Sequence, residues 1–140
     1  MTPSHLDSLD PVYAELVQIT RLVGSAMNRA TQSLLDADLS LAESVIDADA
    51  QIDTLTGDVE ERCFDIIALQ HPAGEDLRVV IGALRIAASL ERMGDLAEHV
   101  AKQARLRFPR PSIPQELRGT FAEMGGLAEA ICSKTGMVIL

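Results

Sequence analysis

Apolar residues recur every three or four positions along most of the chain, and strand-like alternation never holds for more than a few residues. This spacing puts the apolar residues on one face of an α-helix, so the chain is predicted to be all-α. The first stripe predicts a long helix over residues 7–35. Its members step by four and three in turn: Leu9, Tyr13, Leu16, Thr20, Val23, Met27, Ala30 and Leu34.

A second stripe over residues 41–69 predicts a second long helix. Asp38 is its expected N-cap, because an aspartate side chain can accept a hydrogen bond from a free amide of the first turn. Pro72 is expected to end the helix. Proline disfavours helical geometry in the residue before it and has no amide hydrogen to donate.

The third helix is predicted to begin near Glu75 and Asp76, whose negative charge favours a first turn, and to reach Phe108. Three helices of about 30 residues that are joined by short turns must run antiparallel to their neighbours. Residues 1–108 are therefore predicted to form an antiparallel, up-down-up three-helix bundle.

Three prolines within residues 109–114 predict a stiff linker after the bundle. Residues 115–140 then carry a fourth helical stripe, which we interpret as the start of an incomplete second bundle. A lone amphipathic helix cannot bury its own apolar stripe. Further chain, or another copy of it, is therefore expected to cover this helix.

The third helix is predicted to carry two apolar stripes on opposite sides, and one of them changes its chemistry after Ala88. Semi-buried carboxylates are costly unless they are paired, hydrogen-bonded or metal-bound. Glu91 and Asp95 are four residues apart, so their side chains share one helical surface. The polar members of this sector are Glu91, Asp95, Glu98, His99 and Lys102.

A second pair with the same spacing, Asp49 and Asp53, flanks the apolar stripe of the second helix. If the two helices pack together, these pairs offer four or more oxygen ligands to a hard cation. The alternative is that all of these acids are solvated or paired with nearby arginines and lysines. His99 alone is more typical of an exposed helical residue than of a ligand.

Charge and composition narrow the class of protein. The formal charge of −9 argues against binding to nucleic acid, which needs clustered basic residues. No apolar run is long enough to span a membrane, and the first residues do not look like a signal peptide. Cys63 and Cys132 are widely separated, as is typical of free thiols in a reducing compartment. We therefore expect a cytoplasmic protein.

Several short motifs resemble the family of the phosphate-transport regulator PhoU. The resemblance is continuous over roughly residues 7–108, and the linker and fourth helix also fit it. The order and spacing of the motifs together are specific, whereas any single acidic pair is weak. The matching stretches are residues 21–23, 42–43, 45–49, 52–53, 69–72, 76–78 and 90–95.

The resemblance implies two similar three-helix bundles, each with E/D-x-x-x-D motifs that bind metal clusters in some members. In this sequence the motifs are residues 49–53 and 91–95, so the implied metal ligands are Asp49, Asp53, Glu91 and Asp95. Glu98 and His99 are candidates for additional contacts. Iron is the first metal expected, with manganese, magnesium and zinc as alternatives.

The implied function is negative regulation of phosphate uptake and of the phosphate regulon. The family would act as a non-enzymatic adaptor between the ATPase subunit of the phosphate ABC transporter and a phosphate-sensing histidine kinase, and would meet the membrane only through these partners. The second pair of motifs is absent here, so the chain looks truncated or half-length. A half-length form is expected to pair with itself as a homodimer.

Three rival functions follow from the same residues. A carboxylate-bridged di-metal enzyme would use Glu-x-x-His pairs, but position 94 is Gly and position 101 is Ala, so no such pair follows Glu91 or Glu98. A structural helical-bundle module without metal would simply keep its acids solvated. Phosphotransfer through His99 has only a helical histidine beside an acid to support it.

Overall fold

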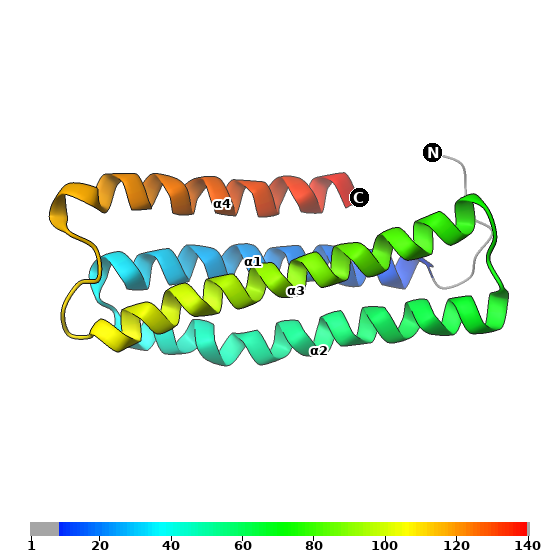
Figure 1. Cartoon of the computed structure of the whole chain (residues 1–140), viewed down its shortest axis with the longest axis horizontal. Coiled ribbons are helices and arrows are strands. Elements are labelled where there is room, and N and C mark those ends of the chain that lie inside the picture. The colour runs from blue at the N-terminus through cyan, green and yellow to red at the C-terminus, as the bar shows by residue number, and fades with distance from the viewer. Residues whose placement is uncertain (1–8, 140) are drawn as a thin grey trace.

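The computed structural model describes residues 9–139, which form four α-helices and one short 3-10 helix (Figure 1). The predicted all-α class is confirmed. The predicted start of the first helix at residue 7 lies outside the described residues. The elements are α1 (Leu9–Asp36), α2 (Leu39–Gln70), α3 (Glu75–Arg107), η1 (Gln115–Leu117) and α4 (Arg118–Ile139).

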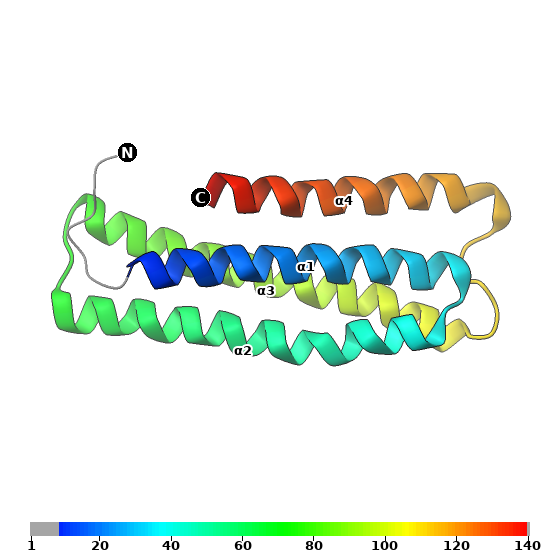
Figure 2. The same cartoon turned by 180° about the vertical axis from the view of Figure 1, so that it is seen from behind.

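The turns between the first three helices follow local chemistry. Ala37 adopts a left-handed conformation (φ 50°) after α1, and Asp38 caps α2 by accepting a hydrogen bond from the amide of Leu41 at 3.0 Å. This cap was predicted. His71 and Gly74 both have positive φ in the turn before α3, at 46° and 59°. Both turns are short, so α1, α2 and α3 lie side by side as an antiparallel bundle (Figures 1 and 2).

A line of mostly small residues on α3 packs against both α1 and α2. The sequence pattern predicted two apolar stripes on opposite sides of this helix, and the buried line overlaps both of them: Leu90, Ala97 and Ala104 belong to one stripe and Val80 to the other. Its remaining members are alanine and glycine, which let the three helix backbones approach closely. Its members are Val80, Ala83, Ala87, Leu90, Gly94, Ala97, Ala101 and Ala104. Glu91, Asp95 and Glu98 lie at the edge of this line and are half-buried.

Helix α4 lies along α1, and among residues 9–139 it contacts no other helix of the bundle (Figures 1 and 2). Arg118 fixes its start, because the guanidinium donates to the carbonyl oxygen of Leu35 and pairs with Asp36 at 3.1 Å. The start of α4 therefore meets the end of α1, and the two helices run antiparallel. Cys132 and Gly136 are the buried residues of α4. The division into a bundle, a linker and an incomplete second bundle remains a prediction.

None of the helices within residues 9–139 combines the length and apolar character needed to cross a bilayer.

Candidate metal centre

Asp49 is a buried carboxylate on α2 that faces Gly94 on α3. Only 6% of the residue is exposed. A Cβ atom built at Gly94 would lie 3.2 Å from Oδ1 of Asp49 and 3.2 Å from Cγ2 of Ile52. The absence of a side chain at position 94 therefore lets α2 and α3 approach each other beside the carboxylate. Sequence reasoning did not assign this role to Gly94, although a glycine in the middle of a long helix is a signal of close approach.

The carboxyl group of Asp49 is only partly satisfied by the surrounding protein. Its buried Oδ1 atom has no hydrogen-bond partner among the described residues. Burial raises the pKa of Asp49 to about 8, with help from the hydrogen-bonding carboxyl of Glu98 and the negative charges of Asp53, Glu98 and Asp95. A buried and unpaired carboxylate oxygen is costly, and a bound cation is one of the few arrangements that offset the cost.

Asp53 and Asp95 complete a group of three aspartates from two helices. One carboxylate oxygen of each of Asp49, Asp53 and Asp95 lies within 4.8 Å of the other two. Asp53 is exposed and Asp95 is half-buried, so the group opens from the α2–α3 interface towards solvent. Burial, followed by the charges of Asp95 and Glu98, raises the pKa of Asp53. Within residues 9–139 none of the three forms an ion pair with lysine, arginine or histidine.

Glu91 lies beside this group without belonging to it. The residue is half-buried, and burial raises the pKa of its carboxyl group. The negative charges of Asp53, Asp95 and Glu60 add to that rise, so Glu91 interacts electrostatically with two of the three aspartates. Of the four predicted ligands, three therefore converge in the structure and the fourth is an acidic neighbour.

Glu98 and His99, the two candidates for additional contacts, lie outside the group of three. Glu98 forms an ion pair with Lys102, and its pKa is lowered first by the hydrogen bond with Asp49 and then by Lys102. Glu98 therefore links the buried carboxyl to a basic residue. His99 is exposed and lines a shallow hollow of about 360 Å³ together with Lys102, Gln103, Arg105 and Leu106.

The donor set suits a hard cation. Three carboxylates supply oxygen atoms alone, and oxygen ligands are preferred by magnesium, manganese and calcium and are also used by iron. Waters can complete the coordination on the exposed side at Asp53. The unpartnered oxygen of Asp49 and the convergence of three carboxylates both fit a metal ion, and no cysteine or histidine belongs to the group.

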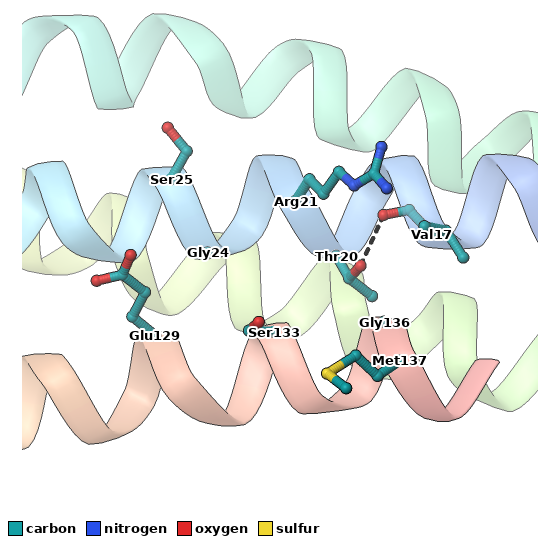
Figure 3. A pocket seen from close by; sticks show the side chains of 9 residues that line it. All are labelled: Val17, Thr20, Arg21, Gly24, Ser25, Glu129, Ser133, Gly136 and Met137. Atoms are coloured by element: carbon teal, nitrogen blue, oxygen red, sulfur yellow. Dashed lines mark hydrogen bonds between the residues drawn. The ribbon is translucent and has the colours of Figure 1, made fainter. Parts of the chain in front are cut away.

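A different hollow, of about 410 Å³, lies between α1 and α4 (Figure 3). Two of its polar residues already have partners: Thr20 donates to the carbonyl of Val17 at 2.6 Å, and Glu129 accepts a hydrogen bond from Asn28 at 2.8 Å. Its one cationic side chain is Arg21, and none of the three aspartates lines it. This hollow is therefore separate from the candidate metal centre.

Comparison with known proteins identifies the family to which this chain belongs. The PhoU domain matches residues 16–104. The phosphate-specific transport system accessory protein PhoU homolog 2 of Mycobacterium tuberculosis is 43% identical over 140 residues, which are 100% of this chain and 66% of that protein. PhoU homolog 1 of Mycobacterium leprae is 41% identical over 140 residues, or 63% of its length. The PhoU homolog of Aquifex aeolicus is 39% identical over 105 residues, which are 75% of this chain and 48% of that protein.

The chain thus spans just under two thirds of the mycobacterial relatives that it matches. The PhoU domain match includes all three aspartates, together with Glu91 and Gly94. The helical bundle and the matched residues agree with the resemblance found in the sequence motifs. This chain belongs to the PhoU family.

Proposed function

We propose that this chain is a metal-binding accessory protein of phosphate-specific transport. Family membership supports the transport role, because the relatives carry that name. Since the chain spans 66% of its mycobacterial relative, the activity of the whole relative is carried over only as a proposal. The observation that carries the metal-binding part is the group of Asp49, Asp53 and Asp95 around an unpartnered buried oxygen.

In this proposal the three aspartates hold the metal and Glu91 contributes a fourth carboxylate, directly or through water. The bound cation would offset part of the negative charge of the carboxylates and would link α2 to α3. Iron is the first candidate, and manganese, magnesium and zinc are the alternatives. Glu98 would orient Asp49 through their hydrogen bond, and Lys102 would hold Glu98 in place through its ion pair.

The regulatory part of the proposal concerns partners. The chain would act in the cytoplasm as a negative regulator, joining the ATPase subunit of the phosphate ABC transporter to a phosphate-sensing histidine kinase. The role is that of an adaptor, without a catalytic step of its own. Its acidic surface favours protein partners over nucleic acid.

Metal analysis tests the first part of the proposal. Protein purified without chelator and then reconstituted with iron or manganese is expected to hold metal, and Asp53→Asn with Asp95→Asn is expected to lower the bound metal at least about tenfold. The matched control is Asp47→Asn with Asp58→Asn, which removes the same charge from exposed positions of α2. Equal metal content in the two variants, or no metal after reconstitution, would instead favour a structural module.

A pull-down tests the second part. The tagged chain is incubated with the transporter ATPase subunit and with the kinase, at high and at low phosphate. Capture of both proteins that depends on phosphate supports the adaptor role. Capture of neither, by a chain that is folded and metal-loaded, contradicts it.

A further inference from the structure

The outer side of α3 carries a shallow hollow between two arginines, which we call the arginine hollow. Its volume is about 410 Å³, and its lining residues are Leu77, Arg78, Ile81, Gly82 and Arg85. Arg85 lies about 160° round the helix from the buried Ala83, which belongs to the line that packs on α1 and α2. Within residues 9–139 α3 makes no contact with α4. The hollow therefore faces away from the other helices of the described chain.

The charge around the arginine hollow is opposite to that of the whole chain. The chain has 21 acidic and 12 basic residues, whereas residues 77–90 contain two arginines and no aspartate or glutamate. Arg78 and Arg85 are exposed, and neither forms an ion pair within residues 9–139. They are seven residues apart, or about 10 Å along the helix axis, so they form a row on one side of α3. Unpaired guanidinium groups of this kind suit carboxylates.

Gly82 lies in the floor of the hollow, and nothing among residues 9–139 requires a glycine there. Its position is in the interior of α3, where glycine is less favourable than alanine. A Cβ atom built at Gly82 would meet no atom within 4 Å. Gly94, by contrast, makes room for α2. The space left by Gly82 opens outwards between Leu77 and Ile81, where it can receive an apolar side chain from another molecule.

We propose that the arginine hollow is a docking site for an acidic amphipathic helix of a partner protein. An apolar side chain of that helix fills the space above Gly82, and carboxylates two turns apart on the same helix pair with Arg78 and Arg85. The apolar contact supplies affinity, and the charges set the position along α3. Nucleic acid would also attract arginines, but the formal charge of −9 disfavours so large a polyanion.

The acidic residues farther along α3 limit where an acidic helix can lie. Glu91, Asp95 and Glu98 follow directly after the acid-free stretch. Like charges facing each other across an interface are unfavourable. The partner helix is therefore held over the first half of α3, beside the candidate metal centre and not on it. The docking needs no bound metal and does not rest on the proposed transport role.

Titration with a synthetic helix tests the charges. The probe is a fluorescein-labelled peptide of about three heptads, with leucine at positions a and d and glutamate at positions e and g. We expect its fluorescence anisotropy to rise on titration with the 140-residue chain. Arg78→Glu with Arg85→Glu is expected to weaken binding at least about tenfold. Arg105→Glu with Arg107→Glu is the matched control, because both residues are exposed on the same helix outside the hollow, and it should change the affinity less than about twofold.

Two further comparisons test the apolar floor. Gly82→Gln fills the hollow at a position where the chain itself leaves room, so the variant should unfold in urea no earlier than the wild type and bind the peptide severalfold more weakly. A second peptide with alanine in place of every leucine keeps the charge and the helix. We expect it to bind at least about tenfold more weakly than the leucine peptide.

Four results would overturn the proposal: no binding of the leucine peptide, equal loss of affinity in the control variant, full affinity in Gly82→Gln, or equal binding of the two peptides. The last result would mean that the arginines attract any acidic peptide without a docking site. The titrations contain neither added metal nor a transport protein, so their outcome is separate from the tests of the proposed function.

Discussion

Gly94 on α3 stands directly against the carboxylate of Asp49 on α2, with 3.2 Å between Oδ1 of Asp49 and the place where a Cβ atom would lie. Gly94→Ala would press a methyl group on this oxygen and on Ile52, both of which are buried. Alanine normally stabilises a helix interior by about 0.8–1 kcal/mol relative to glycine. We expect that gain to be lost at position 94, and metal affinity to fall as Asp49 is displaced.

Gly82→Ala is the matched control for this substitution, because position 82 lies on the same helix and a Cβ atom there meets nothing within 4 Å. Urea unfolding is expected to show a gain of about 0.5–1 kcal/mol for Gly82→Ala and none for Gly94→Ala. Equal gains at the two positions would contradict the close approach of α2 and α3 at the candidate site.

The raised pKa of Asp49 predicts how the stability of the metal-free protein depends on pH. The folded protein holds the Asp49 proton up to about pH 8, whereas the unfolded chain releases it near 3.8. The folded state therefore binds more protons between these values, and the free energy of unfolding falls as pH rises through this window. Asp53 and Glu91 act in the same direction, and Glu98, whose pKa is lowered, acts in the opposite direction.

Urea unfolding in chelator at pH 5, 6, 7 and 8 checks this dependence. A tenfold change in proton affinity corresponds to about 1.4 kcal/mol, so we expect a loss of more than about 1 kcal/mol over the range. Asp49→Asn should flatten the profile and raise stability at pH 8. Asp58→Asn, at an exposed position of the same helix, should leave the slope unchanged. A slope shared by the wild type and Asp49→Asn would refute the assignment to Asp49.

Local chemistry made much of the fold predictable. The Asp38 cap and the proline after α2 act within a few residues, so the helices begin and end close to where the pattern indicated. The packing line on α3 was not predictable in the same way, because alanine and glycine carry little hydrophobic signal. Ala83, Ala87 and Ala101 are buried because they are small, and that becomes evident only when two neighbouring helices are in place.

The candidate site was predictable in its residues but not in its geometry. Residues four apart share a helical face, so Asp49 with Asp53 and Glu91 with Asp95 could be paired from spacing alone. Which carboxylates converge depends on how far α3 is shifted along α2, and the sequence does not encode that shift in any local pattern. The structure brings Asp95 into the group and leaves Glu91 beside it.

The Asp38 side chain predicts a measurable contribution from one hydrogen bond. Asp38→Ala removes the acceptor for the Leu41 amide at the start of α2. Loss of an N-cap costs about 0.5–2 kcal/mol, so the free energy of unfolding should fall by that amount. Asp38→Asn keeps an acceptor oxygen and should retain most of the stability. A loss with Asn as large as with Ala would show that charge, rather than the cap, is responsible.

The contact between α1 and α4 depends on Gly125. A Cβ atom at this position would lie 2.9 Å from Cβ of Thr31, which rotation of the threonine side chain cannot relieve because Cβ is fixed to the backbone. Gly125→Ala must therefore shift α4 away from α1, whereas Gly126→Ala meets nothing within 4 Å. We expect Gly125→Ala to destabilise the protein by about 1–3 kcal/mol and Gly126→Ala to be neutral or stabilising.

Amide hydrogen exchange shows which helices are destabilised by Gly125→Ala. In Gly125→Ala the amides of α4 should exchange faster while those at the α2–α3 interface keep their protection, because α4 contacts α1 alone among the bundle helices of residues 9–139. Uniformly faster exchange over the whole bundle would mean that α4 and the three-helix bundle unfold as one unit. Unchanged exchange in α4 would contradict the packing of Gly125 on Thr31.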